Sequence, residues 1–351
     1  MANSITFSNK GNQALMAEAG PQNLAMDFRE PAYDNAFDGH GTLGLIDSYA
    51  MFFPEANIDN KPIYYFRHYD VAKNYYRFGN FMDLGEDVLS PQKGVLHGDQ
   101  VAGPETSVVR YHKISDDPLC FSYSSSDKLV DYKFYSDHID IKEGNFLDVT
   151  ATPLPIAIYD HNSVFQNTGV VFQPLLYKGT MDGKPTVGLG EVERMFFHED
   201  ITGFDNVPMG YVCVTGSGIR HDGRIEATLL SIAINPTGKN FAYYFLEGEE
   251  PVISDVITMT ANWEHLPYVD DGTCVFKDAV FEFGGKKINF LGKWGTKGFQ
   301  PEPRIERHGQ SQAVGSWFEG DEPYEHRLYV GFAESMEAYD KVLTDLGFDV
   351  K

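Results

Sequence analysis

The sequence predicts an all-β protein, made of two β-barrels or strongly twisted sandwiches, with an irregular N-terminal wrap and a C-terminal helix. Three observations support this fold class. From about residue 61 onward, short runs rich in Val, Ile, Tyr and Phe partly alternate with polar residues, as half-buried strands do. The 34 glycines and 18 prolines punctuate these runs, and the 14% of aromatic residues supply large side chains for an interior.

The predicted strands follow one another along the chain. In the first half they cover residues 61–70, 106–114, 119–123, 129–141 and 146–151. In the second half, four turn dipeptides lie between such runs: Asp182-Gly183, Asp222-Gly223, Asp271-Gly272 and Gly284-Gly285. Dipeptides of this kind are the strongest short-range signal for a β-hairpin, so each predicts one.

One helix is expected over residues 335–346. Ser335 can cap its first turn, Gly347 can end it, and the apolar residues between them form a single stripe. The stripe consists of Met336, Tyr339, Val342, Leu343 and Leu346. The chain is therefore expected to close with a helix that packs on the last β domain.

We expect three parts along the chain. Residues 1–60 form a wrap or lid, since prolines and glycines interrupt every pattern there, and residues 61–240 and 241–351 form the first and second β domains. Gly188–Glu193 and Gly315–Glu319 are both glycine-led strands that end in an acid, which suggests two similar halves.

The composition narrows the range of partners and compartments. The net charge of -23 repels phosphate backbones, and no Lys/Arg cluster interrupts it, so we expect neither nucleic acid nor a membrane as a partner. Cys120, Cys213 and Cys274 lie in apolar runs without a CxxC pair, which predicts buried, unpaired thiols. The N-terminus lacks a basic segment followed by an apolar one, so we expect a cytoplasmic protein. A homodimer is one possible assembly.

No strong cofactor or metal motif is present in the sequence. There is no P-loop, HExxH or GxSxG, and Gly188-x-Gly190 lies on the return strand of a predicted hairpin, where it cannot place phosphate at a helix N-terminus. The pairs Asp137-His138 and Asp160-His161 lack ordered ligand spacing. We therefore expect no cofactor and no metal.

One hairpin carries a family resemblance. The segment from Tyr177 to Arg194 turns at Asp182-Gly183 and returns through Gly188-x-Gly190 to an acidic end, and it resembles a lipocalin-type hairpin. It is similar to the tandem-lipocalin proteins of the carotenoid 1,2-hydratase (hydroxyneurosporene synthase) and AttH-like group, with a pattern match over about residues 121–319.

The resemblance implies two lipocalin-like barrels and a pocket within or between them for an apolar substrate. It also implies cofactor-free acid–base reactions such as hydration, cyclisation or isomerisation. Those enzymes commonly show an acid beside Trp and His, whereas this chain has Glu193-Arg194-Met195, so Glu193 matches the acid and its neighbours depart from the pattern.

Glu193 is the first candidate catalytic residue. In a strand of period two, either Glu193 or Arg194 faces the interior, not both, unless a bulge intervenes. A carboxyl among Phe and Met side chains is held in its protonated form, as a general acid near neutral pH requires. The alternative is a pair of solvated charges on the outer face.

A second candidate group follows at residues 263–268. Trp263 can pack against a flat substrate, while His265 or Tyr268 can move a proton as the partner of Glu193. The alternative is a loop whose aromatic residues seal the end of a barrel.

Three more residues are assigned to substrate binding with Trp263 and Arg194. Arg304 and His308 share one face of an extended segment, which makes either a lined pocket or a salt-bridged solvent edge. His161 lies where an apolar run passes into a polar loop, the kind of transition at which pockets open in β-barrels.

Taken together, these features predict a cofactor-independent lyase, hydratase or isomerase that uses general acid–base catalysis on a hydrophobic, aromatic or isoprenoid-like small molecule. Two alternatives remain: a non-catalytic intracellular carrier of a hydrophobic ligand, and a carbohydrate-binding or lyase β-sandwich. A pocket with two or more ionisable groups favours the enzyme, a purely apolar pocket the carrier, and an open groove of Trp and Tyr the sugar binder.

Overall fold

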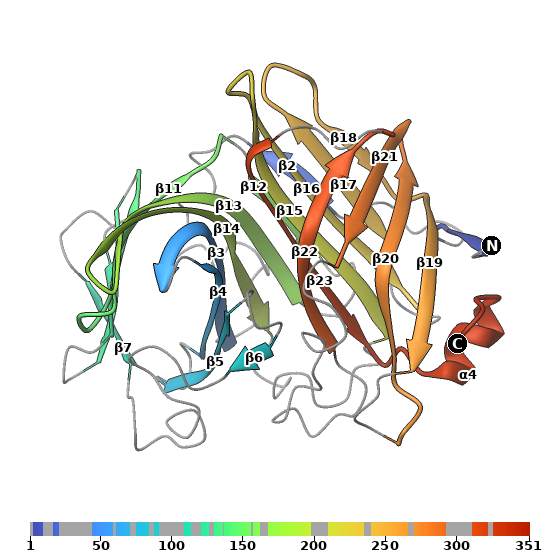
Figure 1. Cartoon of the computed structure of the whole chain (residues 1–351), viewed down its shortest axis with the longest axis horizontal. Helices are drawn as coiled ribbons and strands as arrows, with labels where there is room; N and C mark the ends of the chain where they lie inside the picture. The colour runs from blue at the N-terminus through green and yellow to red at the C-terminus, as the bar shows by residue number, and fades with distance from the viewer. Residues whose placement is uncertain are drawn as a thin grey trace. The chain divides into compact units, whose positions relative to one another are not determined.

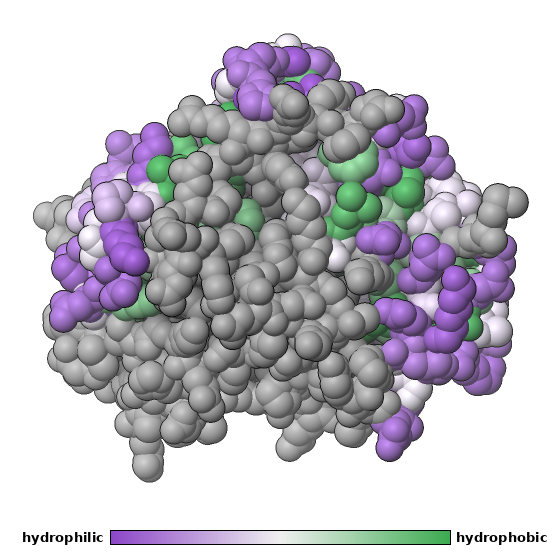
Figure 2. All heavy atoms as spheres, viewed as in Figure 1, coloured by the Kyte–Doolittle hydropathy of each residue, from purple (hydrophilic) through white to green (hydrophobic). Residues whose placement is uncertain are grey.

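The computed structural model is all-β, with one short helix among the described residues, which confirms the predicted fold class (Figure 1). It describes residues 3–9, 17–20, 44–58, 61–70, 75–83, 88–90, 109–113, 121–125, 130–135, 137–155, 157–161, 168–197, 210–234, 240–265, 270–292, 311–321 and 326–351. No helix in these ranges is long and apolar enough to cross a membrane. Figure 2 shows hydrophilic side chains over much of the described surface, as the charge of the chain leads one to expect.

The chain divides into two compact units. Unit 1 comprises residues 1–17, 162–166 and 206–351, and unit 2 comprises residues 18–161 and 167–205. This division differs from the predicted one: the expected boundary near residue 240 falls between two strands of the same sheet in unit 1, which pair residue by residue. The chain instead passes from unit 2 to unit 1 between residues 197 and 210.

Unit 1 contains a ten-stranded antiparallel sheet in the order β1-β19-β20-β21-β22-β23-β15-β16-β17-β18. Its elements are β1 (Ser4–Phe7), β15 (Tyr211–Arg220), β16 (Ile225–Ala233), β17 (Phe241–Leu246), β18 (Val252–Ser254), β19 (Ile257–His265), β20 (Cys274–Phe283), β21 (Lys286–Leu291), β22 (Ser311–Glu319), β23 (His326–Met336) and α4 (Asp340–Leu346).

The sheet of unit 1 folds over itself at β22. The first half of that strand pairs with β23 through Gly315, and the second half pairs with β21 from Ser316 onward. The buried cluster of the unit accordingly draws side chains both from β15–β17 and from β19–β21, with Trp263 and Trp317 among the largest. Two layers of strands around one core form a β-sandwich.

Unit 2 contains a thirteen-stranded antiparallel sheet, whose main path runs β6-β5-β4-β3-β14-β13-β11-β10-β9-β8-β7. Its strands are β2 (Ala17–Gly20), β3 (Gly44–Ile58), β4 (Lys61–Asp70), β5 (Tyr75–Asp83), β6 (Val88–Ser90), β7 (Val109–Lys113), β8 (Phe121–Ser125), β9 (Val130–Phe134), β10 (Ile139–Glu143), β11 (Leu147–Pro153), β12 (Ala157–His161), β13 (Thr168–Met181) and β14 (Lys184–Phe197).

The sheet of unit 2 curls until distant strands meet. Tyr49 on β3 and Tyr132 on β9 are five strands apart along the sheet, yet their ring centroids lie 5.1 Å apart in an edge-to-face contact. Both side chains are fully buried. Strands this far apart can touch only if the face that carries the two tyrosines is the concave inner face, so unit 2 has a barrel-like interior.

The predicted hairpins are confirmed at three of four dipeptides. Asp182-Gly183, Asp222-Gly223 and Gly284-Gly285 connect β13 to β14, β15 to β16 and β20 to β21. Asp182 and Gly183 have φ angles of 49° and 72°, as a two-residue hairpin turn needs. Asp271-Gly272 instead belongs to the longer connection between β19 and β20, part of which lies outside the described residues.

Three other expectations differ from the structure. The predicted strand 129–141 is a hairpin of β9 and β10, because the Tyr135 backbone N–H bonds to the carbonyl of His138 and closes a turn. Residues 44–58, expected in a wrap, form β3, a central strand between β14 and β4. The helix begins at Asp340, five residues late, because Ser335 still pairs with β15 and β22, and it ends before Gly347 as predicted.

Candidate functional site

Three of the predicted site residues have described side chains: Trp263 and His265 lie in unit 1, and Glu193 lies in unit 2. In unit 1, Trp263 is fully buried and packs edge-on against Phe276 and Phe348, with centroid distances of 5.1 and 5.9 Å. His265, at the end of β19, is half-exposed, with its Nε2 3.4 Å from Asp340 Oδ2. Trp263 therefore belongs to the core of the sandwich and His265 to its surface.

Glu193 lies on β14 in unit 2, opposite Phe172 of β13 and Ser48 of β3. The register of β13 with β14 runs without a bulge, so Glu193 lies on the opposite face from Val192, the cross-strand partner of Tyr49. Glu193 thus points away from the interior that Tyr49 and Tyr132 fill. Arg194 lies on β14 and His161 on β12, but their side chains are outside the described part of the structure. Tyr268, Arg304 and His308 lie wholly outside the described residues.

A different carboxyl lies inside unit 2. Glu143, the last residue of β10, is 0% exposed, and the Tyr132 hydroxyl donates a hydrogen bond of 2.7 Å to its Oε1. The local sequence explains its direction: Ile139, Ile141 and Glu143 alternate with exposed or half-exposed residues and share the buried face of β10. Glu143 faces Val130 across the ladder, so Tyr132 is its diagonal neighbour on β9.

Aromatic side chains share the inner face with this pair. Tyr49 packs on Tyr132, and on the same inner face Tyr177 lies 5.9 Å from Phe53. Burial, together with the charge of Glu191, holds the pKa of Tyr177 well above its usual range, so this phenol stays protonated. The Glu143–Tyr132 pair therefore lies in an interior where water is scarce and proton donors are fixed by packing.

Unit 1 contains a second buried Tyr–Glu pair of the same geometry. The Tyr244 hydroxyl donates to Glu226 Oε2 at 2.8 Å, from a diagonal position across β16 and β17. Here the Arg220 guanidinium also donates to the same oxygen through Nε at 3.0 Å and Nη2 at 2.8 Å. These two charge-assisted bonds favour an ionised Glu226, which suits a structural ion pair better than a proton donor.

Sequence reasoning missed both buried acids, although a signal was present. In β10, whose sequence is IDIKE, Ile139, Ile141 and Glu143 occupy alternate positions and therefore point to the same face. An acid at the buried positions of an alternating strand predicts a buried carboxyl that needs a partner.

Within the described residues, no group of three or more His, Cys, Asp and Glu side chains could hold a metal ion.

The comparisons with known proteins bear on the fold. No protein-family model matches the sequence, and no curated protein matches it. Among solved structures, a Nitrosomonas europaea protein provisionally assigned as an AttH superposes with a TM-score of 0.51 at 10% identity, covering 86% of this chain and 96% of that one. The chain has the AttH-like, lipocalin-like fold.

The predicted family resemblance is thus confirmed at the level of the fold. Kievitone hydratase from Nectria haematococca superposes with a TM-score of 0.45 at 9% identity, covering 85% of this chain and 90% of that chain. At such identities the AttH-like likeness concerns the path of the backbone, so the chemistry has to be argued from this chain's own side chains.

Proposed function

We propose that this protein is a cofactor-independent hydratase, lyase or isomerase that acts on a hydrophobic, aromatic or isoprenoid-like small molecule inside unit 2. In this proposal Glu143 moves the proton and Tyr132 holds its carboxyl in place. The observation that carries it is the 2.7 Å hydrogen bond between these two fully buried side chains, on the aromatic inner face of a curled sheet.

The pair can perform a balanced hydration. Glu143 donates a proton to one carbon of a substrate double bond, and a water molecule adds to the cation that forms on the other carbon. A proton of that water then returns to Glu143, so the net change is the addition of one water. The Tyr132 hydroxyl stabilises the carboxylate between the two steps by donating its hydrogen bond to Oε1.

Glu193 remains a predicted alternative acid, and its position gives a matched comparison. Both residues are glutamates in unit 2, but Glu143 shares the inner face with Tyr132 whereas Glu193 lies on the opposite face of β14. The proposal therefore predicts that the two glutamates respond differently to the same substitution.

The test offers the protein a panel of aromatic and isoprenoid alkenes in D₂O and follows deuterium incorporation by mass spectrometry. We expect Glu143→Gln to lower turnover by roughly 100-fold or more, since general acid–base groups contribute 10²–10⁴-fold, and Glu193→Gln to change it less than about twofold. Far-UV circular dichroism checks that each variant is folded.

The opposite ranking of the two variants would move the chemistry to Glu193. If the parent and both variants bind a probe saturably but incorporate no deuterium into it, the protein is a carrier instead.

A further inference from the structure

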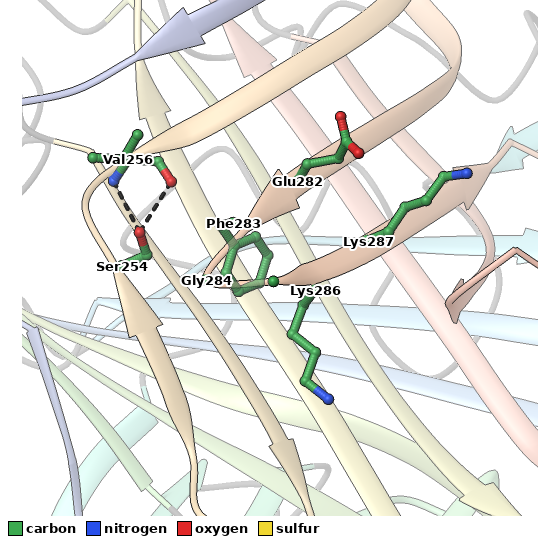
Figure 3. A pocket seen from close by; sticks show the side chains of 8 residues that line it. Ser254, Val256, Glu282, Phe283, Gly284, Lys286 and Lys287 are labelled. Carbon is green, nitrogen blue, oxygen red and sulfur yellow. Dashed lines mark hydrogen bonds between the residues drawn. The ribbon is translucent and has the colours of Figure 1, made fainter.

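An open pocket of about 370 Å³ lies in unit 1, at the tip of the β20–β21 hairpin. One side is the turn between β18 and β19, and the other side is the hairpin itself (Figure 3). The lining consists of Ser254, Val256, Glu282, Phe283, Lys286, Lys287 and the two turn glycines. Its volume falls in the range of small-molecule sites.

The uncharged part of this lining offers mostly apolar surface. Val256 is 48% exposed, which is unusual for a large aliphatic side chain in this unit. The Ser254 hydroxyl is already engaged within its own turn, since it donates to the Val256 carbonyl at 3.0 Å and accepts from the Val256 N–H at 3.1 Å. A ligand in the pocket would therefore meet an apolar wall here, with little competition from free hydroxyls.

The two lysines of the pocket differ in their partners. Lys287 Nζ donates to Asp321 Oδ1 at 2.5 Å, and this contact raises the pKa of Lys287. The Lys286 ammonium has no hydrogen-bond acceptor among the described residues: its nearest carboxylate oxygen, on Glu319, is 4.0 Å away, and the Tyr244 ring centroid is 4.7 Å away.

Lys286 thus has a charge held by weak contacts and three donors available to a ligand. Its side chain is 22% exposed, so a hydrogen bond made there is less weakened by water than one made at the open surface. Glu319, its carboxylate neighbour, is also drawn towards Arg220, with Oε2 3.8 Å from Nη2. Of the two lysines that line the pocket, Lys286 is therefore the one less satisfied by the protein.

We propose that this pocket binds a small molecule with a single carboxylate on a short apolar body. The carboxylate accepts hydrogen bonds from the Lys286 ammonium, and the apolar body covers Val256. Charge-assisted bonds of this kind are the stronger ones in proteins. This site is separate from the proposed chemistry of unit 2 and does not depend on it.

The experiment uses hexanoate as the probe, with hexan-1-ol and hexylammonium as neutral and cationic counterparts of the same length, in isothermal titration calorimetry. We expect saturable hexanoate binding to the parent protein, at least tenfold tighter than either counterpart. Lys286→Met should weaken hexanoate binding at least tenfold, whereas Lys286→Arg should retain it within about fivefold. Lys287→Met is the matched control, because the Lys287 ammonium already donates to Asp321. This variant should change hexanoate binding less than twofold.

Three results would overturn the proposal: no saturable binding of hexanoate to the parent protein, hexanoate binding that Lys286→Met leaves unchanged, or tighter binding of hexylammonium. If Lys286→Met does not fold, Lys286→Gln with the same probe decides in its place. Because all readouts are binding constants, they hold whether or not Glu143 proves catalytic.

Discussion

Substituting Gly216 by Ala tests how tightly the sandwich of unit 1 is built. Gly216 on β15 faces the Trp317 ring, which is fully buried and donates from Nε1 to the carbonyl of Ser217 at 3.3 Å. A Cβ at Gly216 would lie 2.4 Å from Trp317 Nε1 and 2.6 Å from Cδ1 and Cε2. Ordinary contacts are longer by about 1 Å, so either the ring or the strand has to shift.

The expected loss follows from these contacts. Overpacking a close-packed core costs about 1–3 kcal/mol, and displacing the Trp317 ring from the Ser217 carbonyl costs about 1 kcal/mol more. For a unit of this size, a loss of about 2–4 kcal/mol lowers the melting temperature by roughly 5–15 °C. Differential scanning calorimetry measures this shift.

A second substitution distinguishes the clash from a general glycine effect. Trp317→Phe shortens the ring, so the double variant with Gly216→Ala should be more stable than the sum of the single changes predicts. Gly223→Ala is the comparison, since a Cβ there meets no described atom within 4 Å and only the φ of 89° is unfavourable. A Gly216→Ala protein that melts with the parent, or a double variant with strictly additive losses, would refute the packing argument.

Three further predictions concern buried polar groups. Burial raises the pKa of Cys274 to about 12, so iodoacetamide at pH 8 should leave it unlabelled in the native protein and label it after unfolding, by peptide mass spectrometry. Tyr177 should contribute no phenolate absorbance at 295 nm at pH values at which an ordinary tyrosine ionises. Because its folded pKa is raised, its contribution to stability is complete below the ordinary tyrosine value of about 10 and is lost above it. Arg220→Met should cost about 3–5 kcal/mol in urea unfolding, since it leaves Glu226 buried without its cation, and adding Glu226→Leu should recover most of that loss.

The sequence predicted the features that depend on local chemistry. Asp182-Gly183 and Gly284-Gly285 turn the chain where expected, because few other dipeptides accept the required backbone angles. Gly347 ends the helix as expected, with backbone N–H bonds to carbonyls of the last turn. The start of that helix was missed because strand pairing around Ser335 outweighed its value as a cap.

Features set by distant contacts were not predictable in the same way. Tyr49, Met51 and Phe53 are all fully buried, but the proline that follows them hid the strand signal of β3. The division into units depends on which strands pair across more than 100 residues, as Val192 does with Tyr49. The sequence predicted that Glu193 lies on a strand, but it left open which face of that strand is inside. Only the curl of the sheet decides this.

The two buried Tyr–Glu pairs show why position alone does not define a proton donor. In each unit a tyrosine donates to a fully buried glutamate from the diagonal position of a neighbouring strand, at 2.7 Å in unit 2 and 2.8 Å in unit 1. Arg220 adds two charge-assisted bonds to Glu226, and these bonds favour the carboxylate over the neutral carboxyl. A variant that removes the guanidinium from Glu226 without unfolding unit 1 should favour the neutral carboxyl of Glu226 over the carboxylate. If Arg220→Met leaves the carboxyl band of Glu226 unchanged by isotope-edited infrared spectroscopy, the argument that separates the two pairs fails.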